Sequence, residues 1–430
     1  MRARWKIFLY LFGFGFIAYF QARTISVAGE RMMPELGITQ LQLSWIETAF
    51  LVGYAGMQFP GGLLGQRLGA RLTFVLIGLT GFAATVATPL APLLVTGTAL
   101  LAALCALQFL LGCSQGPIFP VSAGVFESWF PSHQWPLAQG WQTMGLGLGA
   151  AATPPVISWL MVHYGWQHAI LWTSPPVLLL VAAWWVYARN TPRDHPAVSQ
   201  AELAELDGPD EQPAEPPNIA LNWRRIQDLL RDRSVLALSV SYIAMNYTFY
   251  LLGNWCFLYL VQERHFDVLS SGWLASVPPL AAGAGAGVGG VLASRLFRRF
   301  GARTGLRAVP LLALPAAGAL LLLCAYAHNP WVAVVSLALC FFAVELTEGS
   351  YWAAIMHVGR GDTMAAAGVM NTGGNLGGII ATPIIGWLSG RHMWFEVFLV
   401  GAAFAVASGL LWLTVEPERA AGRSGAHARS

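Results

Sequence analysis

Long apolar stretches recur along this chain from Trp5 to Leu413, and each of them has about the length of one membrane crossing. The apolar core of a bilayer is roughly 30 Å thick, so one helix needs about 20 mostly apolar residues to span it. Only 10% of the residues are charged, whereas a soluble domain carries about a quarter. The sequence therefore predicts an all-α membrane protein with several membrane passes.

Twelve membrane spans account for the apolar stretches. We place them at residues 6–22, 42–62, 72–91, 95–126, 138–160, 167–188, 233–260, 270–294, 307–327, 330–353, 365–388 and 394–414. An even number of spans puts both termini on the same side. With both termini in the cytoplasm, 20 of the 24 lysines and arginines fall in cytoplasmic segments and four fall outside. Cytoplasmic loops carry an excess of positive charge, so we predict this orientation, in an inner (plasma) membrane of the bacterial type.

The basic residues follow membrane topology, so we expect no nucleic-acid partner. The five cysteines lie inside apolar stretches without any CxxC spacing, which predicts buried free thiols and no metal site. The sequence contains no phosphate-binding loop, zinc-ligand spacing or nucleophile elbow. We therefore expect no cofactor, no ATP-driven transport and no enzyme activity.

The two halves of the chain repeat each other at an offset of 228 residues. Residues 61–68 match residues 289–296, and Gly145, Gly149, Pro155 and Trp159 match Gly373, Gly377, Pro383 and Trp387. The repeat requires the first apolar run to be a retained span, although its basic start would also suit a signal peptide. Two six-span repeats are a common transporter architecture, with the substrate bound near the bilayer midplane and access alternating as the halves rock.

Residues 189–232 form the one long hydrophilic connection of the chain. We therefore expect a six-helix bundle at 1–188, a cytoplasmic linker at 189–232, a second six-helix bundle at 233–415 and a cytoplasmic tail at 416–430. Within the linker, Ser199 and Glu202 have the spacing of a capping box, which predicts a short helix. The acidic, proline-rich residues 207–217 are typical of a flexible linker.

Residues 62–71, Gly-Leu-Leu-Gly-Gln-Arg-Leu-Gly-Ala-Arg, resemble the signature of the major facilitator superfamily between its second and third helices. In that family this loop forms a latch that closes the cytoplasmic side. The resemblance implies gating roles for the matching residues and for the arginine at the repeated position: Gly62, Gly65, Arg67, Gly69, Arg71 and Arg295. Gln66 stands where the family usually has an aspartate, so a latch that depends on an ion pair should be weaker.

More narrowly, the chain resembles the anion:cation symporter branch of that superfamily, whose members carry hexuronates, sugar acids, tartrate and phthalate-like anions. The resemblance is carried in order by residues 19–28, 44–62, 109–120, 129–131, 191–199 and 371–378. Gln21 and Ala22 replace an aspartate and an arginine of the branch, and Gln108 and Gln115 replace an arginine and a glutamate. In the branch these positions contact the anion or carry protons, so the N-terminal half has lost its usual titratable pair.

Polar and aromatic side chains within the predicted spans are the candidates for substrate binding. Gln108 and Gln115 are two helical turns apart and therefore face the same way. Arg23, at the outer end of the first predicted span, could bind an anion or extend toward the membrane surface. The full set is Tyr19, Gln21, Arg23, Gln108, Gln115, Tyr250, Asn254, Trp255, Tyr351, Asn371 and Asn375. Helix packing and hydrogen bonds between helices explain several of these residues about as well.

Glu345 and Glu348 are the best candidates for proton coupling. Both lie within the tenth predicted span, and at a spacing of three residues they share one face of a helix. A charge at the bilayer centre costs about 2.5–3.5 kcal/mol on insertion scales, so such residues normally face a cavity. Two neighbouring carboxylates repel each other, which favours a bound proton. The alternative is an ion pair with an arginine of another helix, and Glu47 is a weaker coupling candidate.

The favoured hypothesis is a secondary transporter that imports a small organic anion together with protons, as a single chain in the lipid bilayer. One charge crossing 100 mV is worth about 2.3 kcal/mol, so an anion that enters an inside-negative cell needs an accompanying cation. Two alternatives stay open at this point. One is a facilitator or exchanger for a neutral polar solute, and the other is a membrane sensor that does not transport.

Overall fold

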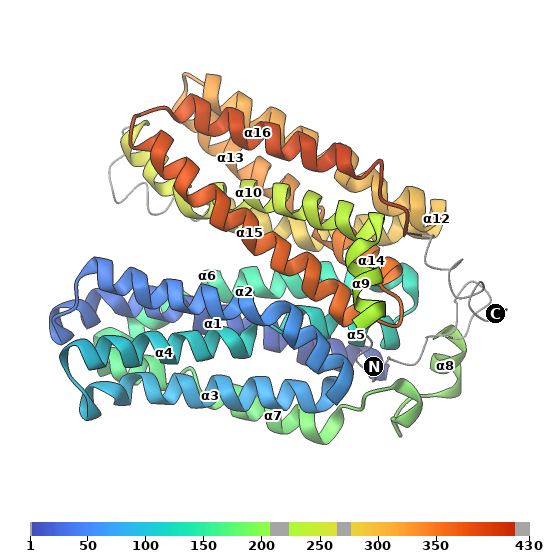
Figure 1. The fold of residues 1–430 in the computed structure, drawn as a ribbon, viewed down its shortest axis with the longest axis horizontal. Coiled ribbons are helices and arrows are strands. Elements are labelled where there is room, and N and C mark those ends of the chain that lie inside the picture. The colour runs from blue at the N-terminus through green and yellow to red at the C-terminus, as the bar shows by residue number, and fades with distance from the viewer. Residues whose placement is uncertain (1, 207–222, 265–276, 418–430) are drawn as a thin grey trace. The chain divides into compact units, whose positions relative to one another are not determined.

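The computed structural model describes residues 2–206, 223–264 and 277–417. All regular structure in these ranges is helical (Figure 1). The elements are α1 (Ala3–Leu36), α2 (Gln40–Leu68), α3 (Ala70–Leu94), α4 (Gly97–Gln115), α5 (Ile118–Trp129), η1 (Ser132–Gln134), α6 (Trp135–Leu171), α7 (Pro175–Tyr187), η2 (Pro192–Asp194), α8 (Gln200–Leu206), α9 (Trp223–Arg231), α10 (Arg233–Gln262), α12 (Val277–Tyr326), α13 (Pro330–Glu345), α14 (Glu348–Val358), α15 (Thr363–Ser389) and α16 (Trp394–Leu411). The predicted flexible segment 207–217, the first residues of the span at 270–294 and the tail from 418 onward lie outside the described residues.

Eight helical segments of the described chain are long and apolar enough to cross a membrane. Two of them, Ser132–Tyr187 with 56 residues and Val277–Tyr326 with 50 residues, are far longer than one crossing requires. Gly165 in the first and Gly301 in the second each have a φ angle of 79° and kink the helix, and the first segment is also broken at residues 172–174 between α6 and α7. L-residues other than glycine rarely adopt such a φ angle, so each of these glycines interrupts its helix.

The first helix is longer than the sequence predicts. The apolar run suggests a span at 6–22, whereas α1 extends to Leu36. Charged residues after Ala22 lower the hydropathy, but they do not oppose helix formation. The helix ends only at Gly37, which adopts the left-handed conformation with a φ angle of 66°.

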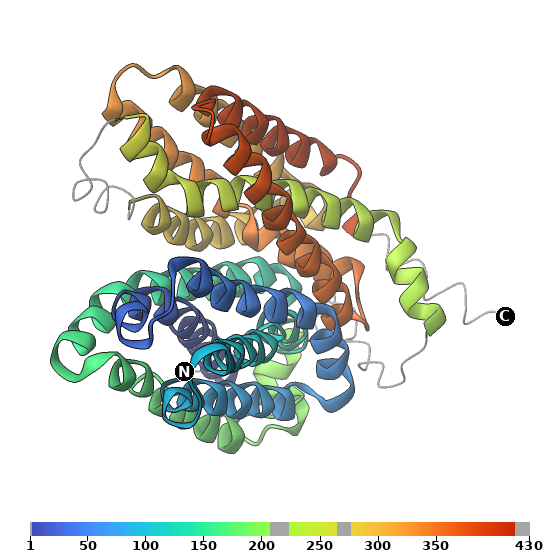
Figure 2. The ribbon, with the colours of Figure 1, turned by 60° about the vertical axis from the view of Figure 1, so that its left-hand side comes forward.

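The helices form two compact units. Unit 1 comprises Met1–Trp129 and Gly145–Ala220, and unit 2 comprises Phe130–Met144 and Leu221–Ser430. Within unit 1, α4 packs against both α2 and α3. Within unit 2, α12 packs against α13 and α16, and α10 packs against α15. Figures 1 and 2 both show α10 and α15 side by side.

The internal sequence repeat coincides with repeated close contacts between helices. In unit 1, a Cβ atom added at Gly149 of α6 would lie 2.2 Å from the carbonyl oxygen of Phe16 in α1. In unit 2, a Cβ atom added at the matching Gly377 of α15 would lie 2.3 Å from the carbonyl oxygen of Ile243 in α10. Only glycine allows backbones to approach this closely, so each glycine of the matched pair holds two helices of its own unit together.

Two predicted spans are interrupted by two-residue turns, and a third, at 167–188, is broken at residues 172–174 between α6 and α7. The continuous spans expected at 95–126 and 330–353 are instead α4 with α5 and α13 with α14, each broken by a two-residue turn. Pro117 lies in the first turn and lacks the N–H group that would continue the helix. In the second turn, the Thr347 hydroxyl donates a 2.7 Å hydrogen bond to the Val344 carbonyl and competes with the backbone pattern. Both breaks lie beside the polar residues that the sequence singled out, Gln115 and Glu345.

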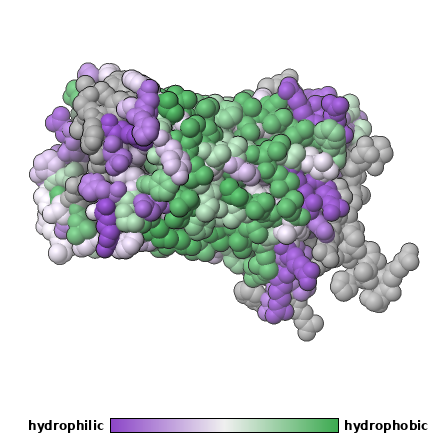
Figure 3. Space-filling model, turned by 90° about the horizontal axis from the view of Figure 1, so that it is seen from above, coloured by the Kyte–Doolittle hydropathy of each residue, from purple (hydrophilic) through white to green (hydrophobic). Residues whose placement is uncertain are grey.

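Hydrophobic side chains gather over the middle of the helices on the face drawn in Figure 3, and hydrophilic ones lie toward the helix ends. Several large apolar residues of this kind are exposed, among them Leu312 and Leu410. An exposed apolar band of helices is the surface that a bilayer covers.

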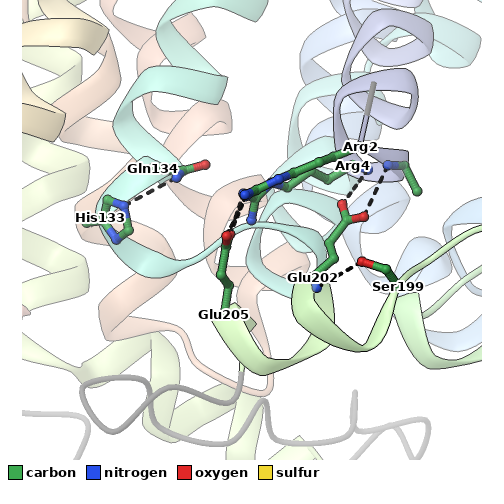
Figure 4. A network of polar contacts seen from close by, with 8 residues as sticks. Arg2, Arg4, His133, Gln134, Ser199, Glu202 and Glu205 are labelled. Carbon is green, nitrogen blue, oxygen red and sulfur yellow. Dashed lines mark hydrogen bonds and ion pairs between the residues drawn. The ribbon is translucent and has the colours of Figure 1, made fainter.

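The start of the linker is bound to the beginning of α1. Ser199 accepts a hydrogen bond of 3.2 Å from the Glu202 N–H, which is one half of the predicted capping box. The Glu202 carboxylate does not complete that box, because it accepts hydrogen bonds from the backbone N–H groups of Ala3 and Arg4 at 3.2 and 3.0 Å (Figure 4). Glu202 therefore caps α1, whose first N–H groups have no partner within the helix.

Candidate functional sites

The carboxylate pair Glu345 and Glu348 lies at the break between α13 and α14. Glu345 is the last residue of α13, Glu348 is the first residue of α14, and each is only 5% exposed. The Glu348 carboxylate accepts hydrogen bonds from the Tyr242 hydroxyl at 3.0 Å and from the Trp352 indole N–H at 2.7 Å. The break thus brings two acids into one buried place and supplies donors to one of them.

Glu345 has a different environment from Glu348. No hydrogen bond or ion pair reaches its carboxylate from any residue that the structure describes, and its charge interacts with that of Glu348. The expected alternative, an ion pair with arginine, is formed by neither glutamate within the described ranges. Two buried carboxylates this close cannot both be charged at low cost, so the pair is suited to hold a proton.

Tyr351 lies next to this pair but is tied into a hydroxyl cluster. Its side chain is fully buried, and its hydroxyl lies 2.5 Å from Ser241 Oγ and 2.8 Å from Ser408 Oγ. The rings of Tyr242 and Tyr351 pack with their centroids 5.0 Å apart. The Tyr351 ring therefore packs against the Tyr242 ring, and the Tyr351 side chain is not exposed at any surface.

The predicted polar residues of α10 and α15 come together in unit 2. The Tyr250 hydroxyl donates a hydrogen bond of 3.2 Å to the Asn375 side-chain oxygen, and the Asn375 amide donates to the Asn371 carbonyl at 2.9 Å. Asn371 is buried, whereas Asn254 is exposed and Trp255 is half-buried. Tyr250 and Asn254 are one helical turn apart, so they continue one polar face of α10.

The three predicted glutamines come together inside unit 1. The Gln115 amide donates a hydrogen bond of 3.4 Å to the Gln21 side-chain oxygen, and the Gln21 amide donates to the Thr173 carbonyl at 3.4 Å. Gln21 and Gln108 also line a small cavity. All three glutamines are buried, so they form a neutral polar centre within the helix bundle.

Arg23 and Tyr19 lie on a different face of α1 from Gln21. Arg23, Ser26 and Glu30 are exposed and Tyr19 is half-buried, and their spacing of three or four residues puts them on one stripe. Arg23 lies inside the helix and not at its end, because α1 continues to Leu36. None of the described residues forms an ion pair or a hydrogen bond with its guanidinium, so the charge is available to an anion.

The predicted gating loop ties α3 to the end of α7. The Arg71 guanidinium donates to the Trp185 carbonyl at 2.6 and 3.2 Å and lies 4.2 Å from the Trp185 ring centre. The Asn190 side chain accepts the Arg71 N–H at 2.9 Å. Gly69 has a φ angle of 78°, and a Cβ atom there would lie 2.5 Å from Asn190, so only glycine fits this turn.

The other gating candidates are divided between buried and exposed positions. Gly62 and Gly65 are buried, as is Gln66, which stands at the position of the usual aspartate, whereas Arg67 and Arg295 are exposed. Glu47, the weaker coupling candidate, is half-buried in α2. Cys256, Cys324 and Cys340 are buried as expected, but Cys105 and Cys113 are half-buried on the surface of α4, so for these two the expectation of burial is wrong.

Sequence reasoning missed Tyr242, Trp352 and the threonines around Gln108. Trp352 lies one helical turn after Glu348, so the spacing of four residues could have indicated it. Tyr242 lies 106 residues away from Glu348 along the chain, and no local pattern connects them. Among the described residues, no group of three His, Cys, Asp or Glu side chains is placed to hold a metal ion.

Membrane-length helices that enclose acids, amides and hydroxyls define a multi-pass membrane protein of the transporter class. The sequence profile of the Major Facilitator Superfamily matches residues 11–370, so the chain belongs to this superfamily. It is a membrane transporter and not an enzyme.

Relatives with assigned names lie in the sugar-acid branch, which confirms the resemblance seen in the sequence. A protein of Bacillus subtilis named a probable galactarate/D-glucarate transporter is 28% identical over 95% of this chain and 91% of its own length. A probable sulfoacetate transporter of Cupriavidus necator is 29% identical over 94% of this chain and 91% of its length. A D-galactonate transporter of Escherichia coli is 25% identical over 96% of this chain and 95% of its length.

Solved structures of transporters share the fold. The proton:xylose symporter XylE has a TM-score of 0.76 at 14% identity, over 96% of each chain. The fucose:proton symporter of Escherichia coli has a TM-score of 0.70 at 15% identity, over 96% of this chain and 100% of its own. At such low identity the likeness shows the all-helical major facilitator fold alone.

Proposed function

We propose that this transporter is a proton-coupled symporter that imports a small organic anion, of the sugar-acid or dicarboxylate class, by alternating access. The named relatives, which match more than nine-tenths of the chain, support this substrate class. The observation that carries the proton coupling is the buried pair Glu345 and Glu348 at the break between α13 and α14.

The electrical balance of the membrane gives the pair its role. One charge crossing 100 mV is worth about 2.3 kcal/mol, so a dianion that enters an inside-negative cell alone is opposed by about twice that amount. A proton bound by the carboxylate pair offsets part of this cost and links uptake to the proton gradient.

In unit 1, Arg23 is the proposed ligand for a carboxylate of the substrate. A guanidinium can form two parallel hydrogen bonds to a carboxylate, and Tyr19 lies on the same face of α1. In unit 2, the polar face with Tyr250, Asn254 and Asn375 offers groups that hydrogen-bond to hydroxyls, as sugar acids require.

We propose twelve spans with both termini in the cytoplasm of a bacterial-type inner membrane, working as a single chain. Two of the eight membrane-length segments are long enough to cross twice, and α2 and α15 are helices of 29 and 27 residues. Six-helix bundles at 1–188 and 233–415, joined by a linker, follow from this count. Arg67 and Arg295 are proposed to act in gating at repeated positions of the two halves.

A second candidate is a facilitator or exchanger for a neutral polar solute. The observation in its favour is the Gln21–Gln115 contact, because amides cannot titrate near neutral pH. This alternative leaves Glu345 and Glu348 without a role in coupling.

The test is uptake into proteoliposomes of radiolabelled galactarate and of galactitol, the neutral polyol of the same carbon skeleton, with and without an imposed pH gradient. We expect galactarate to accumulate when the outside is acidic, and the double variant Glu345→Gln/Glu348→Gln to lose this response. Glu396→Gln, half-buried in the first turn of α16, is the matched control and should behave as wild type. Uptake of galactitol but not of galactarate, or a full pH response in the double variant, would contradict proton-coupled anion symport and favour the facilitator or exchanger for a neutral polar solute.

A further inference from the structure

A small cavity with a mixed lining of polar side chains and of Ile25, Leu111 and Ile170 lies among the helices of unit 1. It has about 10 Å³ of space for the centre of a water-sized sphere, which is room for about one water molecule. Its polar lining comes from α1, α3, α4 and the turn after α6: Gln21, Thr24, Thr85, Thr88, Gln108 and Thr173. Each of these side chains is at most 5% exposed. A sugar acid is larger than this space, so we consider a smaller ligand for it.

Three of the threonine hydroxyls in the cavity lining can accept a hydrogen bond from a ligand. The hydroxyls of Thr24, Thr88 and Thr173 donate to carbonyls of their own segments, at 2.8, 2.9 and 2.8 Å. Their hydrogens are therefore directed into the backbone, and their lone pairs remain for a ligand.

Two further oxygens have no partner at all. The Gln108 side-chain oxygen and the Thr85 hydroxyl are buried without a hydrogen bond from any residue that the structure describes. An acceptor buried in this way costs about 1–3 kcal/mol unless something pairs with it. The site therefore suits a ligand that donates hydrogen bonds, or a cation.

We propose that this cavity binds one small monovalent cation, for which sodium is the probe. A ring of neutral oxygens can replace the hydration shell of such an ion. No lysine, arginine or histidine lines the cavity, whereas an anion would meet the side-chain oxygens of Thr24, Thr85, Thr88, Gln108 and Thr173 in its lining. A carboxylate is also missing from the lining, so binding in the millimolar range is expected.

The site is independent of the carboxylate pair in unit 2 and of the identity of the substrate. A bound cation that travels with the anion would add one positive charge to each cycle, in the direction that the membrane potential favours. A cation that stays in place would instead hold α1, α3 and α4 together.

The experiment measures the melting temperature of the detergent-purified protein while sodium chloride replaces choline chloride at constant total salt. We expect a saturable rise with sodium, since a ligand that binds only the folded state stabilises it. Thr85→Val removes one oxygen without changing the shape of the side chain, and it should raise the apparent dissociation constant for sodium about tenfold. Thr80→Val, half-buried on the same helix and outside the cavity lining, should leave it unchanged.

Two results would overturn the proposal. A melting temperature that is the same in sodium and in choline would mean that the cavity holds water only. A sodium effect that stays at wild-type strength in Thr85→Val would place the ion elsewhere. If Thr85→Val fails to fold, Gln108→Met, which removes the other unpaired oxygen, takes its place under the same criteria. None of these readouts depends on transport, so a failure here is distinct from a failure of the proposed symport.

Discussion

The Tyr242 hydroxyl of α10 donates a hydrogen bond of 3.0 Å to the carboxylate of Glu348, the first residue of α14. Trp352 donates a second bond to the same carboxylate at 2.7 Å, whereas Glu345 receives none from the described residues. Hydrogen-bond donors stabilise a charged carboxylate. We therefore expect the two acids to divide their work, with Glu345 carrying the proton and Glu348 fixed in place.

Glu345→Gln should abolish accumulation of the substrate while exchange across the membrane continues. A glutamine has nearly the same shape as glutamate but cannot release a proton, so coupling is lost and the carrier cycle remains. Measuring pH-driven uptake and substrate counterflow in the same proteoliposomes checks this. Loss of both activities, with Glu396→Gln normal, would contradict the assigned division of roles.

Arg23→Gln should weaken the binding of an organic anion, with a KM raised about tenfold, since a hydrogen bond to a charged group contributes about 1.5–3 kcal/mol and about 1.4 kcal/mol corresponds to a factor of ten. The maximal rate should change less. Arg31→Gln, which alters another exposed arginine of α1, is the control and should retain the wild-type KM. Equal effects of the two substitutions would mean that Arg23 acts only through the general charge of the surface.

Gly377→Ala should destabilise unit 2, because the added Cβ atom would lie 2.3 Å from the Ile243 carbonyl oxygen. Overpacking of this kind costs about 1–3 kcal/mol. Gly283→Ala in α12 is the matched control, since nothing lies within 4 Å of its added Cβ atom. The measurement is the melting temperature of the purified variants, which should fall for Gly377→Ala and not for Gly283→Ala. An unchanged melting temperature for Gly377→Ala would show that α10 and α15 do not pack this closely.

Acid should release the linker from the start of α1. Glu205 pairs with Arg2 and Arg4, both at 2.5 Å. Burial raises the pKa of Glu205, but the hydrogen bonds and charges of Arg4 and Arg2 outweigh it and hold this pKa below its usual 4.5. A lowered pKa in the folded state gives stability that is present above pH 4.5 and is lost as the pH falls through the folded value.

The check is the melting temperature of the wild type and of Glu205→Gln between pH 7 and pH 4. The variant should be less stable at pH 7, because the buried Arg4 loses its counter-charge, and the difference should shrink toward acid. Glu30→Gln, which changes an exposed acid of α1, should follow the wild type throughout. A difference that does not depend on pH would exclude the ionised Glu205 as its source.

Much of the fold can be read from local patterns. The lengths of the apolar runs indicate α3, α10, α15 and α16 to within three residues at each end, because a membrane helix must satisfy its own backbone within one continuous segment. The end of α2 was placed six residues too early, at 62 instead of Leu68. The interruptions at Gly116–Pro117, at residues 172–174 and at Leu346–Thr347 were missed. Each is set by two or three residues inside a strongly apolar run, where the average hydropathy changes little.

The candidate sites divide in the same way. Glu345, Glu348 and the glutamines stand out in the sequence because polar side chains in an apolar run are costly. Their partners do not stand out. Gln115 lies 94 residues from Gln21, and Glu202 lies about 200 residues from the N–H groups that it caps.

The sequence by itself determined that this chain is a helical membrane transporter with acids and amides inside its spans, since the bilayer imposes length and hydropathy on each segment separately. Tertiary structure alone decided that the Glu348 carboxylate has two hydrogen-bond donors among the described residues and the Glu345 carboxylate none, and that Gln108 lines a small cavity while Arg23 lies exposed. The physical reason is that burial and hydrogen bonding depend on which helices meet, and the Tyr242–Glu348 contact is made by residues that only packing brings together.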